Sequence, residues 1–302
     1  MSGQIFTLIG GNGFIGRQVA KKLLRLGHSV RIAARDPQRN MDALAQEFGE
    51  HLSFHPCDLK TMDGLENIVD DAYGVVNFVG ILHEGGAQSF MDLQAEAAGE
   101  VAEMAYENGV GRFVHMSAVG ADTHSPSLYA QSKAIGEINV TTAFPAATIL
   151  RPSIVVGEGD GFFGRFSKMV RMTPFVLGFA GGSTRFQPVQ VDDVAEAVVV
   201  ALTGLSAYEG TYELGGPKIY SFKELLKLML GVMGKKRLLM DMPLWLATPM
   251  AAFLEKLPEP PLTRDQLKLL AHDNIIQPKT LGFTDLGITP KPIEDIIESA
   301  IA

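Results

Sequence analysis

Several features that define other protein classes are missing from this sequence of 302 residues. A single cysteine, Cys57, excludes an intramolecular disulfide and a cysteine-rich zinc site, and we interpret it as a small buried apolar residue. The most apolar stretch, Met242–Leu254, is interrupted by Pro249, so we expect no membrane-spanning helix. With 26 Lys+Arg against 34 Asp+Glu, the net charge of −8 provides no basic surface for a polyanion. Nucleic acid is therefore not an expected partner.

Signals for metal binding and for export are also absent. The seven histidines do not form a metal-binding pattern, so we expect no metal ion. The segment Met1–Gln4 is short and uncharged, whereas a signal or transit peptide needs a basic or Arg-rich leader. We expect a cytoplasmic protein, and leave open a peripheral contact with the inner membrane.

The first half of the chain alternates short β-branched runs with longer helical patterns, which predicts repeated βαβ units and a parallel sheet covered by helices. The predicted strands are Ile5–Ile9, Ser29–Ala34, Leu52–His55, Gly74–Val79, Arg112–Ser117 and Ala147–Leu150. The helices predicted between them are Phe14–Leu26, Met41–Phe48, Met62–Val69, Ser89–Asn108 and Ser127–Ala143. This pattern predicts an α/β fold of the Rossmann type, with a doubly wound parallel sheet.

The alternation weakens after Pro152, where Gly and Pro become frequent. Helices are predicted there at Phe162–Arg171, Val194–Thr203, Ser221–Met233 and Thr263–His272. We therefore expect a dinucleotide-binding domain over residues 1–152 and a smaller, mainly helical lobe over residues 153–302. The lobe should pack closely on the first domain and contribute in part to its sheet.

A glycine-rich turn directly follows the first predicted strand and opens the first predicted helix. Its predicted cofactor-binding residues are Gly10, Asn12, Gly13, Phe14, Ile15 and Gly16. Glycines allow a tight turn and a close backbone approach, and the free N–H groups of a helix N-terminus attract a pyrophosphate. Because the motif lies between a strand and a helix of an alternating pattern, it predicts dinucleotide binding.

The end of the second predicted strand bears on which dinucleotide is bound. Arg35 is the first long side chain after Ala33 and Ala34, and its guanidinium suits a 2′-phosphate. This favours NADP(H). Asp36 is a competing ribose ligand, which keeps NAD(H) as the alternative, although it precedes Pro37 and is equally suited to capping the next turn.

Two further strand ends should border the same cofactor. Asp58 and Leu59 follow the third predicted strand, at the edge where the adenine would lie. A plain loop cap is the other interpretation of Asp58. Val79 and Gly80 end the fourth strand, and Gly80 would let the cofactor approach closely.

A candidate reaction centre follows the fifth predicted strand. Tyr129 and Lys133 are four residues apart at the start of a helix, so both side chains share one face, and Ser117 ends the strand. Tyr129 would be the acid or base, with its pKa lowered by the Lys133 ammonium. Lys133 would also hold the nicotinamide ribose, and Ser117 would donate a hydrogen bond to a reacting carbonyl. His115 is expected to be a packed strand residue.

These motifs together resemble the extended and atypical short-chain dehydrogenases/reductases. Gly10, Gly13 and Gly16 match the G-x-x-G-x-x-G turn of that superfamily, and Ser117, Tyr129 and Lys133 match its Ser, Tyr and Lys. Pro152 and Ser153 resemble the segment that flanks the nicotinamide, and are added to the expected cofactor-binding residues. Ile9 departs from the Thr that commonly precedes the turn.

The sequence more closely resembles one branch, the NADPH-binding 39 kDa accessory subunits of respiratory complex I and their bacterial relatives. The segments that carry this resemblance are Tyr129–Glu137, Ala143–Pro145, Arg151–Ser153, Phe186–Val189, Asp192–Val194 and Leu262–Gln266. The resemblance implies tightly held NADPH with no established turnover.

Two functions remain open at this stage. The first is to hold NADP(H) and dock on respiratory complex I or a membrane surface through the C-terminal lobe, with Trp245, Leu246, Met250, Phe253 and Leu254 as an apolar helix face. Burial of that helix within the protein is the alternative. The second is an NADP-dependent oxidoreductase, or an epimerase-like enzyme, acting on a carbonyl, alcohol or sugar-like substrate near Phe162, Phe163 and Phe166. A redox-sensing regulator without chemistry would not need Tyr129 and Lys133 together.

Overall fold

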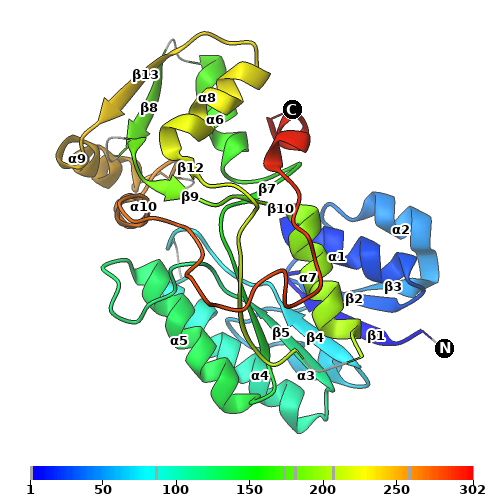
Figure 1. Cartoon of the computed structure of the whole chain (residues 1–302). Coiled ribbons are helices and arrows are strands. Elements are labelled where there is room, and N and C mark those ends of the chain that lie inside the picture. Colours follow the sequence, from blue (N-terminus) through cyan, green and yellow to red (C-terminus); the bar gives the residue numbers. More distant parts are fainter. Residues whose placement is uncertain are drawn as a thin grey trace.

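A seven-stranded sheet forms the centre of the protein (Figure 1). The computed structural model describes residues 3–85, 88–172, 175–179, 182–205, 208–257 and 260–301. The strand order is β11-β6-β5-β4-β1-β2-β3, and every neighbouring pair is parallel. The strands are β1 (Ile5–Ile9), β2 (Ser29–Ala34), β3 (Leu52–Pro56), β4 (Gly74–Asn77), β5 (Arg112–Met116), β6 (Thr148–Pro152) and β11 (Gly210–Leu214). The predicted Rossmann-type α/β fold is confirmed.

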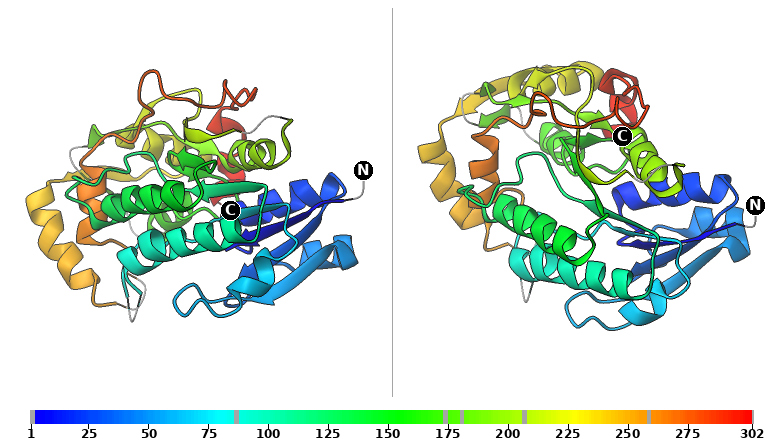
Figure 2. Two further views of the ribbon diagram at one scale, coloured as in Figure 1. Left: turned by 90° about the horizontal axis from the view of Figure 1, so that it is seen from below. Right: turned by 60° about the horizontal axis from the view of Figure 1, so that its bottom comes forward.

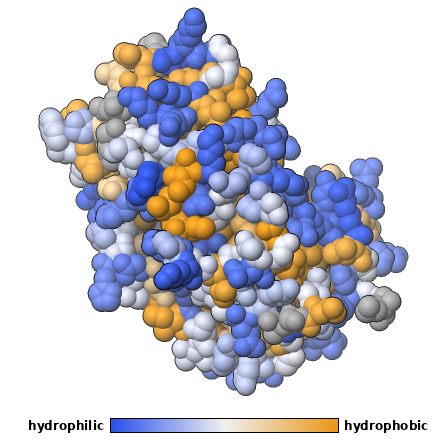
Figure 3. Space-filling view, in the orientation of Figure 1, coloured by the Kyte–Doolittle hydropathy of each residue, from blue (hydrophilic) through white to orange (hydrophobic). Residues whose placement is uncertain are grey.

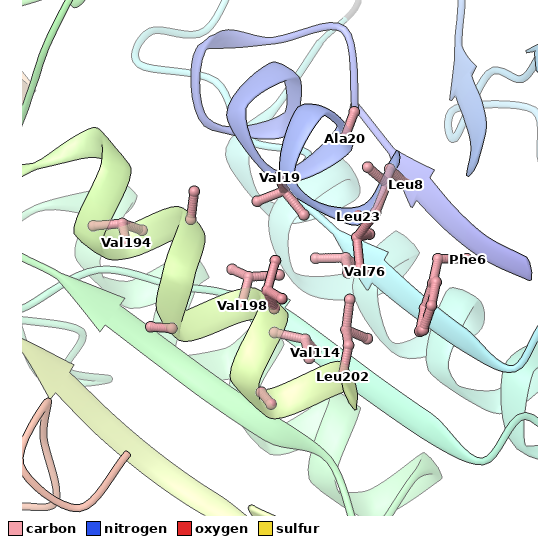
Figure 4. Close-up of a cluster of buried hydrophobic side chains, with 14 of the residues drawn as sticks. Phe6, Leu8, Val19, Ala20, Leu23, Val76, Val114, Val194, Val198 and Leu202 are labelled. Carbon is pink, nitrogen blue, oxygen red and sulfur yellow. The ribbon is translucent and has the colours of Figure 1, made fainter. Parts of the chain in front are cut away.

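Helices cover both faces of this sheet. One face carries α1 (Phe14–Arg25), α2 (Asp42–Phe48) and α7 (Val191–Thr203). The other carries α3 (Leu65–Val69), α4 (Ala97–Glu107) and α5 (Leu128–Ala143). Figure 4 shows side chains of α1 and α7 directed toward Leu8, Val76 and Val114 of the sheet. Because both faces are buried, the central strands β1 and β4 are largely apolar.

A second part of the chain, here called the upper part, lies above the carboxyl edge of the sheet in Figure 1. It contains three two-stranded pairs, β7 (Val155–Val156) with β10 (Val189–Gln190), β9 (Arg185–Phe186) with β12 (Tyr220–Ser221), and β8 (Phe175–Phe179) with β13 (Leu238–Met242). Its helices are α6 (Phe163–Met172), α8 (Phe222–Val232), α9 (Leu244–Leu254), α10 (Arg264–Leu270) and α11 (Ile297–Ile301). These elements share a separate apolar core.

The structure differs from the sequence predictions mainly at element ends and after Pro152. The predicted helix Ser89–Asn108 begins with a π-helical turn, Asp92–Glu96, before α4. Helix α3 starts at Leu65 because the preceding Gly64 is left-handed, with φ of +82°. Strands β4 and β5 are shorter than expected and end at Asn77 and Met116.

The sequence pattern also predicts only in part how the second half of the chain packs on the sheet. Helix α7 and strand β11 follow residue 152 in sequence but belong to the sheet and its covering layer. The domain boundary between residues 152 and 153 therefore stays a prediction. The expectation about the first four residues falls partly on Met1 and Ser2, which lie outside the described residues.

The apolar stretch Met242–Leu254 contains all of α9, at the outer end of the upper part (Figures 1 and 2). Met250 and Leu254 pack against the upper core, whereas Trp245 is 76% and Phe253 71% exposed. The prediction of one common face is therefore wrong, because five residues of helix carry Met250 about 140° around the axis from Trp245. In the described part of the chain, no helix has the length and apolar character needed to span a bilayer.

The contact between α5 and the π-helical turn gives a test of the fold. A Cβ on Gly136 of α5 would overlap the carbonyl oxygen of Gln94, while a Cβ on Gly231 of α8 would meet nothing within 4 Å. We expect Gly136→Ala to lower the free energy of unfolding by about 1–3 kcal/mol through overpacking. Gly231→Ala, the matched control in an exposed helix position, should raise it by up to about 1 kcal/mol. Urea denaturation measures both, and equal effects would contradict the close packing of α5.

Candidate functional site

The glycine-rich turn leaves the N-terminus of α1 open. The Gly10 N–H donates to the Ala33 carbonyl at 2.7 Å, which joins the turn to β2. Gly10 has a φ of +75°, and a Cβ on Gly16 would lie 2.6 Å from the Gly11 Cα, so both positions require glycine. No side chain caps α1. The N–H groups of its first turn, including those of Phe14 and Ile15, therefore lack an intrahelical acceptor and are free for an anion.

The residues after β2 present two cations. Arg35 and Arg39 are both exposed and border the same cavity, and neither forms an ion pair with a residue that the structure describes. Arg39 was not predicted, although its spacing of four residues from Arg35 was a usable signal. The Asp36 carbonyl accepts from Asn12 Nδ2 at 2.6 Å, and its carboxylate makes no hydrogen bond within the described residues. The predicted capping role of the Asp36 side chain is therefore not observed.

The ends of β3 and β4 complete the lower wall of the cavity. Asp58 Oδ1 accepts from the Lys60 N–H at 3.0 Å, which is the loop-cap geometry considered for this residue. Leu59 is buried beside it. Val79 donates its N–H to Asn77 Oδ1, and a Cβ on Gly80 would lie 3.1 Å from Lys133 Nζ. Gly80 thus allows the close approach of the lysine head group.

Tyr129 and Lys133 lie on α5 as predicted, but their electrostatics differ from the expectation. Lys133 Nζ donates to the Met116 carbonyl at 3.0 Å, and burial lowers the pKa of Lys133 to about 8. Burial raises the pKa of Tyr129 to about 12, and its ring packs edge-on against Phe90. The predicted lowering of the Tyr129 pKa by Lys133 is not observed in this structure, where burial disfavours the charged phenolate and raises that pKa.

Ser117 belongs to a buried ionic network that the sequence analysis missed. Its hydroxyl donates to Glu137 Oε1, and Arg151 donates to the same carboxylate through Nε at 2.8 Å and through a second nitrogen at 2.5 Å. Glu213 accepts from Arg151 at 3.5 Å on the other side. The Ser117 hydroxyl therefore donates its hydrogen bond to Glu137 in this structure and does not point to a substrate carbonyl. Glu137 follows Lys133 by four residues on the same helix face, and this spacing could have indicated from the sequence that Glu137 lies near the site.

The upper part is fastened to α5 through Asp265 of α10. The Asp265 carboxylate accepts from the Ser127 hydroxyl at 2.7 Å and from the backbone N–H groups of Leu128 and Tyr129 at 2.8 and 3.2 Å. A capping box formed by Thr263 begins α10 just before it. This contact gives a physical role to the segment Leu262–Gln266, which the sequence analysis singled out only by resemblance.

Two other predicted residues lie where the sheet meets the upper part. Ser153 donates its hydroxyl to Asn274 Oδ1 at 2.6 Å, and Pro152 ends β6 beside it. His115 is fully buried in β5, and burial with the nearby Lys133 charge lowers the pKa of His115 to about 3. Cys57 is also buried, as predicted, and burial raises its pKa to about 11.

A single cavity of about 1610 Å³ brings the predicted site residues together. Its lining includes Gly10, Asn12, Gly13, Phe14, Ile15, Gly16, Arg35, Asp58, Leu59, Val79, Gly80, Ser117, Tyr129, Lys133, Pro152 and Ser153. The cavity continues into the upper part past Phe162 and Phe166, while Phe163 is buried in the core instead. On the face shown in Figure 3, hydrophobic residues gather where the two parts meet. In the described residues, no group of three or more His, Cys, Asp or Glu could hold a metal ion.

Comparison with known proteins agrees with this geometry. The profile of the NAD dependent epimerase/dehydratase family matches residues 6–215. The mitochondrial NADH dehydrogenase [ubiquinone] 1 alpha subcomplex subunit 9 of Arabidopsis thaliana is 32% identical over 99% of this chain and 78% of its own length. The Mus musculus protein of the same name is 31% identical over 97% of this chain and 78% of its own.

A solved structure shows the same fold at lower sequence identity. The UDP-glucuronic acid 4-epimerase of Bacillus cereus, solved with UDP-glucuronic acid and NAD, superposes with a TM-score of 0.74 at 18% identity, covering 99% of this chain and 98% of its own. The similarity to the mitochondrial subunits also extends over nearly the whole chain, but at a higher sequence identity of 31–32%. This chain is therefore a member of the NAD dependent epimerase/dehydratase family, in the branch that contains subunit 9 of respiratory complex I.

Proposed function

We propose that this chain holds NADP(H), in preference to NAD(H), at the carboxyl edge of its sheet. The observation that carries the proposal is that one cavity is bordered both by the uncapped N-terminus of α1 and by two guanidiniums that form no ion pair with a described residue. The first-turn N–H groups of α1 suit a pyrophosphate. Arg35 and Arg39 suit the additional 2′-phosphate that distinguishes NADP(H), because neither forms an ion pair with a described residue.

The preference for the phosphorylated coenzyme can be measured directly. A charge-assisted hydrogen bond contributes about 1.5–3 kcal/mol, so Arg35→Ala should weaken NADPH binding by about tenfold or more. Binding of NADH should change little. Arg25→Ala is the matched control, since Arg25 is an exposed arginine of α1 that does not line the cavity. Calorimetric Kd values for both coenzymes test this, and an unchanged NADPH to NADH ratio in Arg35→Ala would assign selectivity to another residue.

The second element of the proposal is docking on a membrane-bound partner of the complex I type. Similarity to the complex I subunits over nearly the whole chain supports it. The outer face of α9 also supports it, because Trp245 and Phe253 are largely exposed and the exposed Lys256 lies two residues after the end of the helix, beyond Glu255. Aromatic side chains beside basic ones are typical of surfaces that bind at the membrane interface. The protein would then lie at the periphery of the inner membrane.

Flotation with respiratory membranes tests this docking. We expect the double substitution Trp245→Ser and Phe253→Ser to move the protein from the membrane fraction to the soluble fraction, because the apolar contact area is lost. Tyr106→Ser removes an aromatic side chain that is 60% exposed on α4 and serves as the control. Recovery of the unaltered protein entirely in the soluble fraction would count against docking.

An NADP-dependent oxidoreductase is the second candidate function, supported by the extension of the cavity beyond Ser117, Tyr129 and Lys133. In that case Tyr129 would exchange the proton with a carbonyl or alcohol, and Lys133 would hold the nicotinamide ribose. Bound coenzyme supplies the hydride.

The substitution Tyr129→Phe separates the two candidates. It removes the hydroxyl and keeps the ring that packs against Phe90. If the protein is an enzyme, Tyr129→Phe should abolish NADPH consumption with a carbonyl substrate while its Kd for NADPH stays within about twofold, because only the proton donor is lost. Turnover at the unaltered rate in Tyr129→Phe would refute this assignment.

A further inference from the structure

The cavity is larger than one ligand requires. Pockets for a single ligand occupy about 300–1,000 Å³, whereas this cavity measures about 1610 Å³. Its lower portion is bordered by the glycine turn and by the ends of β2 to β5, to which the proposed function assigns NADP(H). The remaining volume lies in the upper part, between α6, α9 and α10.

The walls of this upper portion are mainly apolar. Phe162, Phe166 and Met169 contribute from α6 and the residue before it, Met250 and Leu254 from α9, and Leu269 from α10. All six side chains are only half-buried although they face inward, because they border the cavity. Apolar surface that is left facing a concave site favours an apolar occupant.

Several polar groups of the upper portion are bound by the protein itself, whereas Arg165 of α6, which also borders it, forms no ion pair with a described residue. Lys268 donates to the Pro126 carbonyl at 2.9 Å, and Asn274 bonds to Ser153 and to the Val119 carbonyl. A sugar nucleotide would need several such groups free for its diphosphate and hydroxyls. The chemistry of the walls therefore fits a hydrocarbon chain better than a sugar nucleotide.

Helix α9 separates this portion from an exposed apolar surface. Its inner face presents Met250 and Leu254 to the cavity, and its outer face presents Trp245 and Phe253 to the exterior. At one end, Leu82 lines the cavity and also an adjoining depression that it shares with Leu257, and these two leucines are 50% and 48% exposed. The depression, bordered by these leucines and by polar residues such as Glu84, Glu255 and Lys256, thus adjoins the cavity at the end of α9.

We propose that the upper portion of the cavity binds the hydrocarbon chain of a lipid-like amphiphile, which enters past Leu82 and Leu257. Its polar end would lie beside Ser117 and Tyr129. The proposal rests on the proposed function, since NADP(H) is assigned to the lower portion of the same cavity.

Chain-length dependence of binding tests this inference. The full-length protein, with and without saturating NADPH, is titrated calorimetrically with straight-chain alcohols of about six to twelve carbons. We expect the Kd to fall about fourfold for each added carbon, because burial of a CH₂ group contributes about 0.8 kcal/mol. Met250→Trp fills the cavity and should weaken binding of the longest alcohol by at least about tenfold. Phe253→Trp, on the outer face of the same helix, should not.

The other possible results also decide whether the upper portion binds a hydrocarbon chain. A Kd independent of chain length, or equal losses in Met250→Trp and Phe253→Trp, would overturn the proposal, the latter by assigning binding to the outer face. Tighter binding of UDP-glucose that is lost in Met250→Trp would assign the space to a sugar nucleotide and overturn it as well. If Met250→Trp does not fold, Leu269→Phe narrows the same space from α10. Failure of NADPH to bind would refute the proposed function, whereas chain-length dependence without coenzyme would still support the apolar site.

Discussion

The close packing of α1 on the glycine turn is the constraint on which the site depends. Gly16 lies against Gly11 without room for a side chain, so the helix starts directly at the carboxyl edge of the sheet and its first N–H groups remain uncapped. Parallel strands end at the same edge, and this brings Arg35, Asp58, Gly80 and Ser117 of four different strand ends to one cavity. These residues therefore lie around the same cavity as the uncapped N-terminus of α1.

The charged groups of the cavity are better suited to binding an anion than to transferring a proton. The chain has a net charge of −8, and its cavity is bordered by Arg35, Arg39 and Arg165, which form no ion pair with a described residue, by the Lys133 ammonium, and by the carboxylates of Asp36 and Asp58. At neutral pH, Tyr129 keeps its proton because burial holds its pKa at about 12, and His115 is neutral because its pKa is about 3. Ser117 is engaged by Glu137. In this structure Ser117, Tyr129 and His115 are therefore not poised to accept a proton from a neutral ligand.

The sequence predicted the sheet well because its signals are local. Ile5–Ile9 is an apolar strand followed at once by a glycine turn, and that combination defines both the first strand and the cofactor site. Two-residue strands after Pro152, such as Val155–Val156 and its partner Val189–Gln190, were missed because they are too short to show alternation. Their existence depends on contacts between residues more than thirty positions apart.

The difference between local signals and long-range contacts also explains why the chemistry of the site was predicted incorrectly. Spacing placed Tyr129 and Lys133 on one face of α5, but spacing contains no information on burial, which sets the direction of both pKa shifts. Glu137 was overlooked because its partners, Ser117 and Arg151, come from two different strands. Likewise, only the packed structure assigns Met250 to the cavity and Trp245 to the exterior.

The contact of Asp265 with α5 links the two portions of the cavity. This carboxylate lies at the N-termini of two helices, α10 and α5, where negative charge is favoured at both. Leu269, on the same short helix as Asp265, lines the upper portion, whereas Tyr129 donates its N–H to Asp265 and lines the lower portion. A ligand that displaces α10 must therefore carry the start of α5 with it or break three hydrogen bonds. The position of Tyr129 is thus coupled to whatever occupies the space beside α10, because one carboxylate holds both helices.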